Sequence, residues 1–282
     1  MPDRPLTAVL PTHQRVAALR VTFPAVLAME GVDEVLVVVD GSTDGTVEHL
    51  RTYDDPRLRV LVSPQRRGVT AARNTGARAA AGDVVFLEDD CLFPPDYAVV
   101  LTGEAERYGA AVVGAPMVHP RPGEPVESAV AAARARAEGD GGLDGVARFP
   151  AAPVVTPLLQ APVLVRREVL DELSYDGGYV GNAYREETDF FLRATAAGYR
   201  CLLTDRTYFW EAGRFPGGQP RHPLLAEWWT WRNNWRFLRR HAGWLAEHGH
   251  LTTPAREQLA FTGRRLRGHV WPALRQAVGA RG

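Results

Sequence analysis

Short apolar runs alternate with helical patterns along the first 118 residues. The runs predict four strands, at Leu6–Leu10, Val35–Val39, Leu58–Val62 and Val84–Leu87. Apolar positions with helical spacing between them predict helices over 16–27, 44–53 and 69–81. The unbroken apolar run Val35–Val39 is typical of a strand that is buried on both faces. Such strand–helix repeats predict an α/β fold with a mostly parallel, Rossmann-like sheet flanked by helices.

The remainder of the chain becomes increasingly helical. Its pattern predicts a helix over 186–198, a strand over 199–203 and helices over 223–241 and 254–278. We therefore expect one α/β domain over 1–220 and a C-terminal helical extension over 221–282.

Composition narrows the chemistry. The chain has 282 residues, of which 45% are hydrophobic, and all 33 basic residues are arginine. The lack of lysine excludes Schiff-base and pyridoxal-phosphate lysines and the lysine of a P-loop. The chain has no long apolar run, no basic-then-apolar leader and only two cysteines, which favours a cytoplasmic protein.

Charge is distributed unevenly although the net charge is zero. Residues 221–282 carry eleven arginines against three glutamates, a formal charge of +8, and the first 220 residues carry −8. The basic segment either packs on the acidic body or meets an anionic partner, such as the inner face of a membrane. Trp228, Trp231 and Trp235 share one face of its first helix, as core or as a sugar- or membrane-binding surface.

Three polar clusters fall where predicted strands end, at Pro11–His13, Asp40–Ser42 and Glu88–Asp90. Ligands of such sheets bind at the carboxyl ends of the strands. Three adjacent carboxylates suit Mg²⁺ or Mn²⁺, or form an ordinary acidic surface turn. The helix that opens at Gly68–Thr70 favours anions, and its Arg73 either reaches a phosphate or base edge or packs.

These segments together resemble family 2 glycosyltransferases of the GT-A fold. The resemblance rests on Val37–Thr46, Gly68–Gly76 and Gly82–Asp90, in that order. Two later segments, Gly177–Val180 and Arg185–Phe190, resemble the acidic motif on the acceptor side of that family. Residues 231–241 are similar to a helix that follows the catalytic domain, so the resemblance spans about residues 5–241.

The resemblance implies that the domain over 1–220 is catalytic, with about residues 1–118 as its nucleotide-sugar-binding half and 119–220 as its acceptor-side half. It also implies roles for individual residues. Asp40 is similar to the aspartate that reads the nucleobase, and Pro11, Thr12 and Arg73 fall where the family contacts the nucleotide. In the acidic triplet, Asp90 is the expected metal ligand, with Glu88 as the second candidate and Asp89 or Glu88 near the ribose. Glu187 matches the general base, and Glu186 beside it is the alternative.

The sequence departs from the family pattern at three places. Glu88 replaces the first aspartate of the Asp-X-Asp region, and Glu187 replaces the usual aspartate of the base motif. Trp210 stands where many relatives have a metal-binding histidine, for which His222 is a candidate substitute.

The implied activity is inverting transfer of a sugar from a nucleoside-diphosphate sugar, with UDP or dTDP favoured over GDP. Metal-assisted direct displacement needs one carboxylate base for the acceptor. The acceptor stays open among glycans, lipid-linked glycans, proteins and small metabolites, and no nucleic-acid partner is expected. The alternatives are an inactive scaffold subunit that binds sugar nucleotides and a sugar-phosphate nucleotidyltransferase.

Overall fold

The structure is a computed structural model that describes residues 4–136, 149–218, 222–249 and 253–267. The chain forms two compact units. The first contains residues 1–177 and 186–218, and the second contains residues 178–185 and 219–282. The segment 178–185 thus belongs with the C-terminal helices although it lies within the sequence of the first unit.

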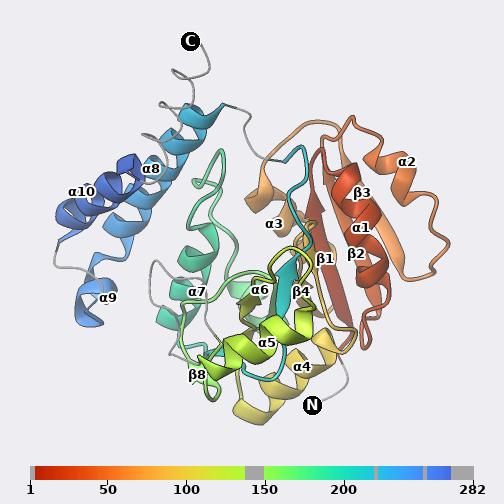
Figure 1. Cartoon of the computed structure of the whole chain (residues 1–282), viewed down its shortest axis with the longest axis horizontal. Coiled ribbons are helices and arrows are strands. Elements are labelled where there is room, and N and C mark those ends of the chain that lie inside the picture. The colour runs from red at the N-terminus through yellow and green to blue at the C-terminus, as the bar shows by residue number, and fades with distance from the viewer. Residues whose placement is uncertain (1–3, 137–148, 219–221, 250–252, 268–282) are drawn as a thin grey trace. The chain divides into compact units, whose positions relative to one another are not determined.

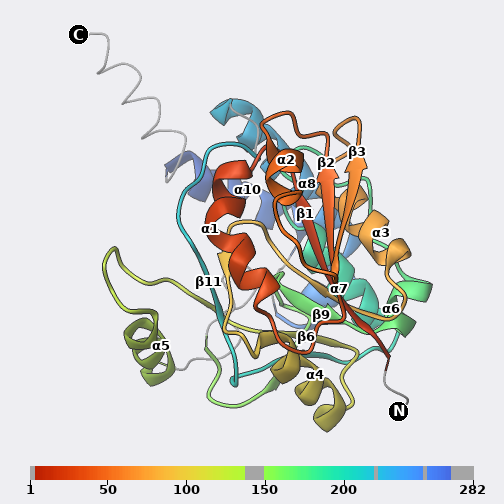
Figure 2. The ribbon, with the colours of Figure 1, turned by 90° about the vertical axis from the view of Figure 1, so that its right-hand side faces the viewer.

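An eight-stranded sheet forms the centre of the first unit (Figure 1). Its order is β3 (Leu58–Ser63), β2 (Glu34–Asp40), β1 (Leu6–Thr12), β4 (Asp83–Phe86), β9 (Val163–Val165), β6 (Val112–Gly114), β10 (Cys201–Leu203) and β8 (Val154–Val155). The first four strands are parallel, as predicted. Strand β9 is antiparallel to both β4 and β6, so the sheet is mixed. Figure 2 shows β2 and β3 ending at the same edge.

Helices cover both faces of this sheet because side chains alternate along each strand. Ala8 and Leu10 of β1 join one apolar cluster, and Val9 joins the other. The first cluster includes α1 (Val16–Leu27), α2 (Thr46–Leu50) and α4 (Tyr97–Tyr108). The second includes α3 (Val69–Ala79), α6 (Arg167–Glu172) and α7 (Glu186–Ala196).

A smaller sheet lies beside the acidic triplet. It joins β5 (Cys91–Leu92), β11 (Phe209–Glu211) and β7 (Met117–Val118), with β11 in the middle. Glu211 stands opposite Cys91 in the antiparallel pairing of β11 with β5. The chain after β11 is therefore brought back to the residues that follow β4. The helix α5 (Val126–Ala135) packs near β7.

Several predicted boundaries change in the structure. The helix expected over 44–53 is shorter, because α2 spans only Thr46–Leu50. The carboxylate of Asp44 accepts the amide of Thr46, the first residue of α2, and also the amide of Val16, which opens α1. Strand β10 begins at Cys201 rather than at Tyr199. The helix expected over 254–278 is described as α10 (Pro254–Arg265), and residues 268–278 lie outside the described part.

The second unit consists of α8 (Pro223–Arg240), α9 (Ala242–Glu247), α10 and the segment 178–185. Asn233 donates from Nδ2 to the carbonyl of Val180 at 2.8 Å and so ties this segment to α8. Gly181 has φ +70° and faces the ring of Trp229, where a Cβ would be 2.2 Å from the indole. None of the described helices is long and apolar enough to cross a lipid bilayer.

Candidate active site

Asp40, the last residue of β2, organises the loop before α3. Its two carboxylate oxygens accept the amides of Arg67 and Gly68, each at 2.7 Å. The residue is buried and lines a cavity of about 270 Å³. That cavity lies among β2, β3 and α3, and its walls include Val38, Leu61 and Thr75. Asp40 thus contributes a carboxylate to the lining of a mostly apolar hollow.

Strand β1 ends at Pro11 and Thr12, beside β2, which lines this cavity. Pro11 pairs with Val38, and both Pro11 and Thr12 are buried. The hydroxyl of Thr12 donates to the carboxylate of Asp89 at 2.7 Å. Thr12 therefore connects the end of β1 to the acidic triplet that follows β4, in agreement with the expected meeting of the strand ends.

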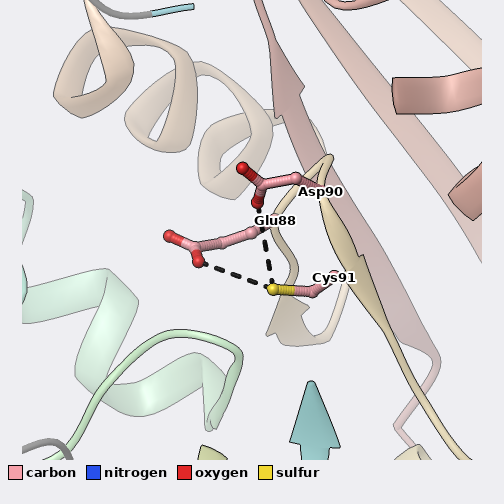
Figure 3. Close-up of side chains that lie close together, drawn as sticks. All are labelled: Glu88, Asp90 and Cys91. Atoms are coloured by element: carbon pink, nitrogen blue, oxygen red, sulfur yellow. Dashed lines mark hydrogen bonds between the residues drawn. The ribbon is translucent and has the colours of Figure 1, made fainter. Parts of the chain in front are cut away.

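Glu88, Asp90 and Cys91 form the group in which a metal ion would fit (Figure 3). One atom from each, a carboxylate oxygen or the thiol sulfur, lies within 4.8 Å of the others. The Cys91 thiol points toward both carboxylates, with Sγ 3.8 Å from Glu88 Oε2 and 3.9 Å from Asp90 Oδ1. Burial raises the pKa of this thiol, and the negative charges of its acidic neighbours raise it further. The thiol therefore stays protonated. Two carboxylates are the donor set of Mg²⁺ or Mn²⁺.

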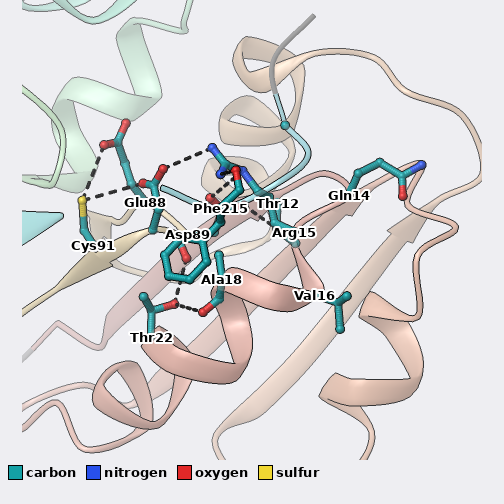
Figure 4. A network of polar contacts seen from close by, with 12 residues as sticks. Thr12, Gln14, Arg15, Val16, Ala18, Thr22, Glu88, Asp89, Cys91 and Phe215 are labelled. Carbon is teal, nitrogen blue, oxygen red and sulfur yellow. Dashed lines mark hydrogen bonds and ion pairs between the residues drawn. The ribbon is translucent and has the colours of Figure 1, made fainter. Parts of the chain in front are cut away.

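Arg15 lies over the acidic triplet from the start of α1 (Figure 4). Its guanidinium is 3.1 Å from Asp90 Oδ2 and 3.7 Å from Asp89 Oδ1. It also donates to the carbonyl of Phe215 at 3.3 Å. The segment 213–218 is thereby held next to the triplet, and Gly217 sits against the carbonyl of Gln14, where any side chain would clash.

Arg73 joins the acidic triplet after β4 to the two glutamates at the start of α7. It lies in α3, is almost fully buried and forms ion pairs with three carboxylates. Its Nη2 is 3.4 Å from Glu88 Oε1 and 2.7 Å from Glu187 Oε1, and its Nη1 pairs with Glu186. Glu88 follows β4, whereas Glu186 and Glu187 begin α7. One buried cation thus gathers side chains almost one hundred residues apart in the sequence.

Negative charge exceeds positive charge in this cluster. Among the described residues, five carboxylates, of Glu88, Asp89, Asp90, Glu186 and Glu187, face two guanidinium groups, of Arg15 and Arg73. Burial, followed by the charge of Glu187, raises the pKa of Glu88 well above its usual range. Burial also raises the pKa of Asp89 to about 7, against the hydrogen bond from Thr12. Such an excess favours a further cation at the site.

Glu186 and Glu187 differ in their exposure to solvent. The Glu186 side chain is 5% exposed, whereas that of Glu187 is 23% exposed. Glu187 is also fixed from its second oxygen, which accepts the amide of Ala161 at 3.2 Å. Glu187 is therefore oriented at both oxygens and still open to solvent.

Trp210 and Glu211 lie in β11, next to the triplet. The amide of Ala212 donates to the carbonyl of Asp90 at 2.8 Å, which fixes the end of β11 here. Trp210, in the position expected for a metal-binding histidine, pairs with Leu92. His222, the candidate substitute, belongs to the second unit, so its role stays an expectation.

Sequence reasoning did not single out Arg15. Its partners are Asp89, Asp90 and Phe215, and the last of these is 200 positions away in the sequence. The one available signal was an arginine that directly follows the polar cluster Pro11–His13 at the end of the first strand. Four of the sequence-predicted residues, Arg73, Glu88, Glu186 and Glu187, are brought into contact. Asp89 and Asp90 follow Glu88 in the triplet and pair with Arg15, and Thr12 donates a hydrogen bond to Asp89.

Comparisons with known proteins point to glycosyltransferases. Residues 7–142 match the model of the family described as glycosyl transferase family 2. The succinoglycan biosynthesis protein ExoO of Rhizobium meliloti is 32% identical over 114 residues, 40% of this chain and 32% of that protein. Validoxylamine A glucosyltransferase of Streptomyces hygroscopicus subsp. jinggangensis is 40% identical over 100 residues, 33% of this chain and 23% of that protein. The matched part thus spans a third or less of these relatives' lengths.

Solved structures share the fold. A mannosyltransferase of Pyrobaculum calidifontis in complex with GDP-Man and Mn²⁺ has a TM-score of 0.56 at 20% identity, covering 96% of this chain and 83% of that one. TarS 1–349 of S. aureus in complex with UDP-GlcNAc has a TM-score of 0.58 at 15% identity, covering 83% and 66%. These likenesses establish the GT-A fold, which confirms the predicted fold class.

Proposed function

Because residues 7–142 match the model of glycosyl transferase family 2, we propose that this chain transfers a sugar from a nucleoside-diphosphate sugar to an acceptor nucleophile. The transfer inverts the anomeric centre by direct displacement and depends on a divalent cation. UDP and dTDP sugars are the favoured donors. The two cysteines, both free and buried, favour a reducing compartment such as the cytoplasm.

The observation that carries this proposal is the contact of Arg73 with both acidic groups. Direct displacement needs leaving-group chemistry and base chemistry on opposite sides of one sugar carbon. Glu88 at the end of β4 and Glu187 at the start of α7 both lie against the same guanidinium. The two groups of carboxylates are therefore close enough to serve one small substrate.

On the donor side, Asp90 and Glu88 would hold Mg²⁺ or Mn²⁺. The cation, when bound, neutralises the charge that develops on the leaving diphosphate. Asp40 would orient the nucleobase, because its remaining lone pairs can accept the imide N–H of a uracil or thymine ring. Thr12 fixes the orientation of Asp89 and so the geometry of the triplet.

On the acceptor side, Glu187 would take the proton from the attacking hydroxyl. It is the more exposed of the two candidate carboxylates, and its hydrogen bonds to Arg73 and to the amide of Ala161 fix its orientation. Glu186, buried against Arg73, would hold that arginine in place.

A second candidate function is binding of sugar nucleotides without turnover. Arg15 supports it, because its guanidinium already neutralises Asp90, and Trp210 supplies no metal ligand. A sugar-phosphate nucleotidyltransferase is disfavoured by the family match.

The test is the Glu187→Gln variant with UDP, dTDP and GDP sugars and Mn²⁺, measured as nucleotide release with water or an added acceptor. The amide keeps the shape and loses the base, so turnover should fall about 100-fold or more while donor affinity stays within about threefold. Glu186→Gln is the matched comparison and should affect thermal stability more than turnover. Unchanged turnover in Glu187→Gln would remove Glu187 as the base, and no turnover by the wild type would favour the binding-only function.

A further inference from the structure

The second unit exposes a continuous apolar face, formed by Leu224, Leu225, Trp228, Trp231, Leu259 and Leu266, which we call the Trp–Leu face. Trp228 is 54% exposed and Leu259 is 73% exposed. Leu224, Trp228 and Trp231 follow one another at helical spacing along α8, and Leu259 of α10 comes seven residues before Leu266, which directly follows that helix. Each helix therefore presents one apolar stripe to the outside.

The two stripes lie side by side. The indole N–H of Trp231 donates to the hydroxyl of Thr262 at 3.1 Å, and Thr262 lies between Leu259 and Leu266 on the same stripe. The rings of Trp228 and Trp231 stack, with centroids 5.7 Å apart and planes 16° from parallel. The indoles are thus held together in a fixed patch. Large contiguous apolar patches on soluble proteins mark interaction sites.

The charges around the Trp–Leu face are positive. Glu227 is neutralised by a bidentate pair with Arg265, with both contacts at 2.6 Å, and Glu257 pairs with Arg264 at 2.8 Å. Arg256, one turn before Leu259, and Arg267, next to Leu266, are both exposed. The guanidinium of Arg267 lies 3.9 Å from where a Cβ of Gly263 would be, on the same stripe. A partner with negative charge would meet cations here and, over the described residues of these two helices, no uncompensated carboxylate.

We propose that the Trp–Leu face binds the surface of a lipid bilayer that contains anionic lipid. Tryptophan is enriched where apolar and polar phases meet, and interfacial helices combine such an apolar face with flanking arginines. Anionic headgroups complement the formal charge of +8 of residues 221–282. A second copy of the chain complements it poorly, because two faces of the same positive sign would oppose each other. A soluble polyanion would pair with the arginines but would make no apolar contact with the exposed leucines.

The experiment is co-sedimentation of the full chain with vesicles of phosphatidylcholine alone or of phosphatidylcholine mixed with phosphatidylglycerol. We expect binding to the mixed vesicles that weakens as salt is raised, and little binding to neutral ones. The double variant Trp228→Ser, Leu259→Ser should bind at least about tenfold more weakly, since both side chains are exposed. The matched control is Val99→Ser, an apolar side chain that is 47% exposed on α4 in the other unit and should change nothing.

Three results would overturn the proposal. They are no binding of the wild type to mixed vesicles, equal binding by the double variant, and equal loss in the Val99→Ser control. Sedimentation velocity without lipid tests the alternative occupant, a second copy of the chain. If the wild type forms a dimer that the double variant abolishes, and does not bind vesicles, the face belongs to a second copy. If the double variant unfolds at a lower temperature than the control, Arg256→Glu with Arg267→Glu replaces it and should remove the preference for anionic vesicles. A charge-reversed variant that keeps that preference would also refute the proposal.

Discussion

At the candidate site, Arg73 holds a buried positive charge. It is almost fully buried in α3 and pairs with Glu88, Glu186 and Glu187, while its guanidinium also lies 5.4 Å from the centre of the Tyr175 ring. Lysine has one compact charged group and cannot replace a planar guanidinium that serves several carboxylates. Removing a buried cation leaves its anionic partners uncompensated.

We therefore expect Arg73→Lys to lower the free energy of unfolding by about 2–4 kcal/mol at pH 7. Urea titration followed by circular dichroism measures this change. Arg78→Lys is the matched control, because Arg78 lies exposed on the same helix and should change stability by under about 0.5 kcal/mol. Equal stability of Arg73→Lys and wild type would contradict the role of Arg73 as the link between the two acidic groups.

The raised pKa of Asp89 predicts how the stability of the fold depends on pH in the absence of metal. Burial raises its pKa to about 7, so the folded chain binds a proton that the unfolded chain releases near pH 4. Folding is therefore favoured at low pH by this group, and its contribution is lost as the pH rises from about 4 through 7. The Asp89→Asn variant, which cannot ionise, should be more stable than wild type at pH 8 by on the order of 4 kcal/mol.

Thermal unfolding of both proteins in EDTA at pH 5 and pH 8 measures this difference. The two melting curves should approach each other at pH 5, where the wild-type carboxyl is largely protonated. A difference that stays the same at both pH values would show that Asp89 does not titrate in this range.

At the scale of residues, the sequence indicated the acidic positions through motifs, and the structure places them at strand and helix ends as expected. It did not indicate what Arg73 touches. An arginine within an Ala-rich helix was compatible with contact to a phosphate, and the three carboxylates come from β4 and α7, which sequence spacing does not bring together. Arg15 was missed for the same reason.

At the scale of elements, the packing of α3 on β1 depends on a glycine. A Cβ on Gly76 would lie 2.3 Å from Cγ1 of Val9, so a side chain there would push the helix from the sheet. Because α3 carries Arg73, such a shift would also move the guanidinium from its partners. This contact gives a physical reason for the glycine that ends the motif Gly68–Gly76.

We expect Gly76→Ala to destabilise the fold by about 1–3 kcal/mol through overpacking. Gly103→Ala is the matched control, because a Cβ on Gly103 in α4 would have nothing within 4 Å, and alanine there should stabilise by about 0.5–1 kcal/mol. Denaturant unfolding of both variants measures the pair. Opposite signs are predicted, and equal signs would contradict the packing argument.

The longer elements were predictable and the short ones were not. The helix over 16–27 and the strand cores of β1, β2 and β3 follow directly from apolar spacing. Strand β9 has three residues and is antiparallel to both neighbours, so its short apolar run carries no signal of direction. The two-residue strands β5 and β7 exist only through their pairing with β11.

At the scale of the whole molecule, the first unit brings the acidic triplet that follows β4 and the two glutamates that begin α7 to one buried arginine. The second unit contains the segment 178–185, which the sequence placed in the catalytic domain, together with the basic helices. Hydrogen bonds from Asn233 and Arg232 hold this segment to α8. These hydrogen bonds join residues about fifty positions apart in the sequence, so local sequence patterns do not indicate that the segment and α8 belong to one unit.

The most direct measurement is calorimetric titration of UDP, dTDP and GDP into the full chain with Mn²⁺, with Mg²⁺ and with EDTA. We predict micromolar binding of UDP or dTDP that needs the cation and weakens at least about tenfold in Asp90→Asn, since that variant loses one of two carboxylate ligands. Binding of none of the three nucleotides would contradict the proposed nucleotide-sugar site. Binding that is the same in EDTA and in Asp90→Asn would contradict the assignment of the metal to Glu88 and Asp90.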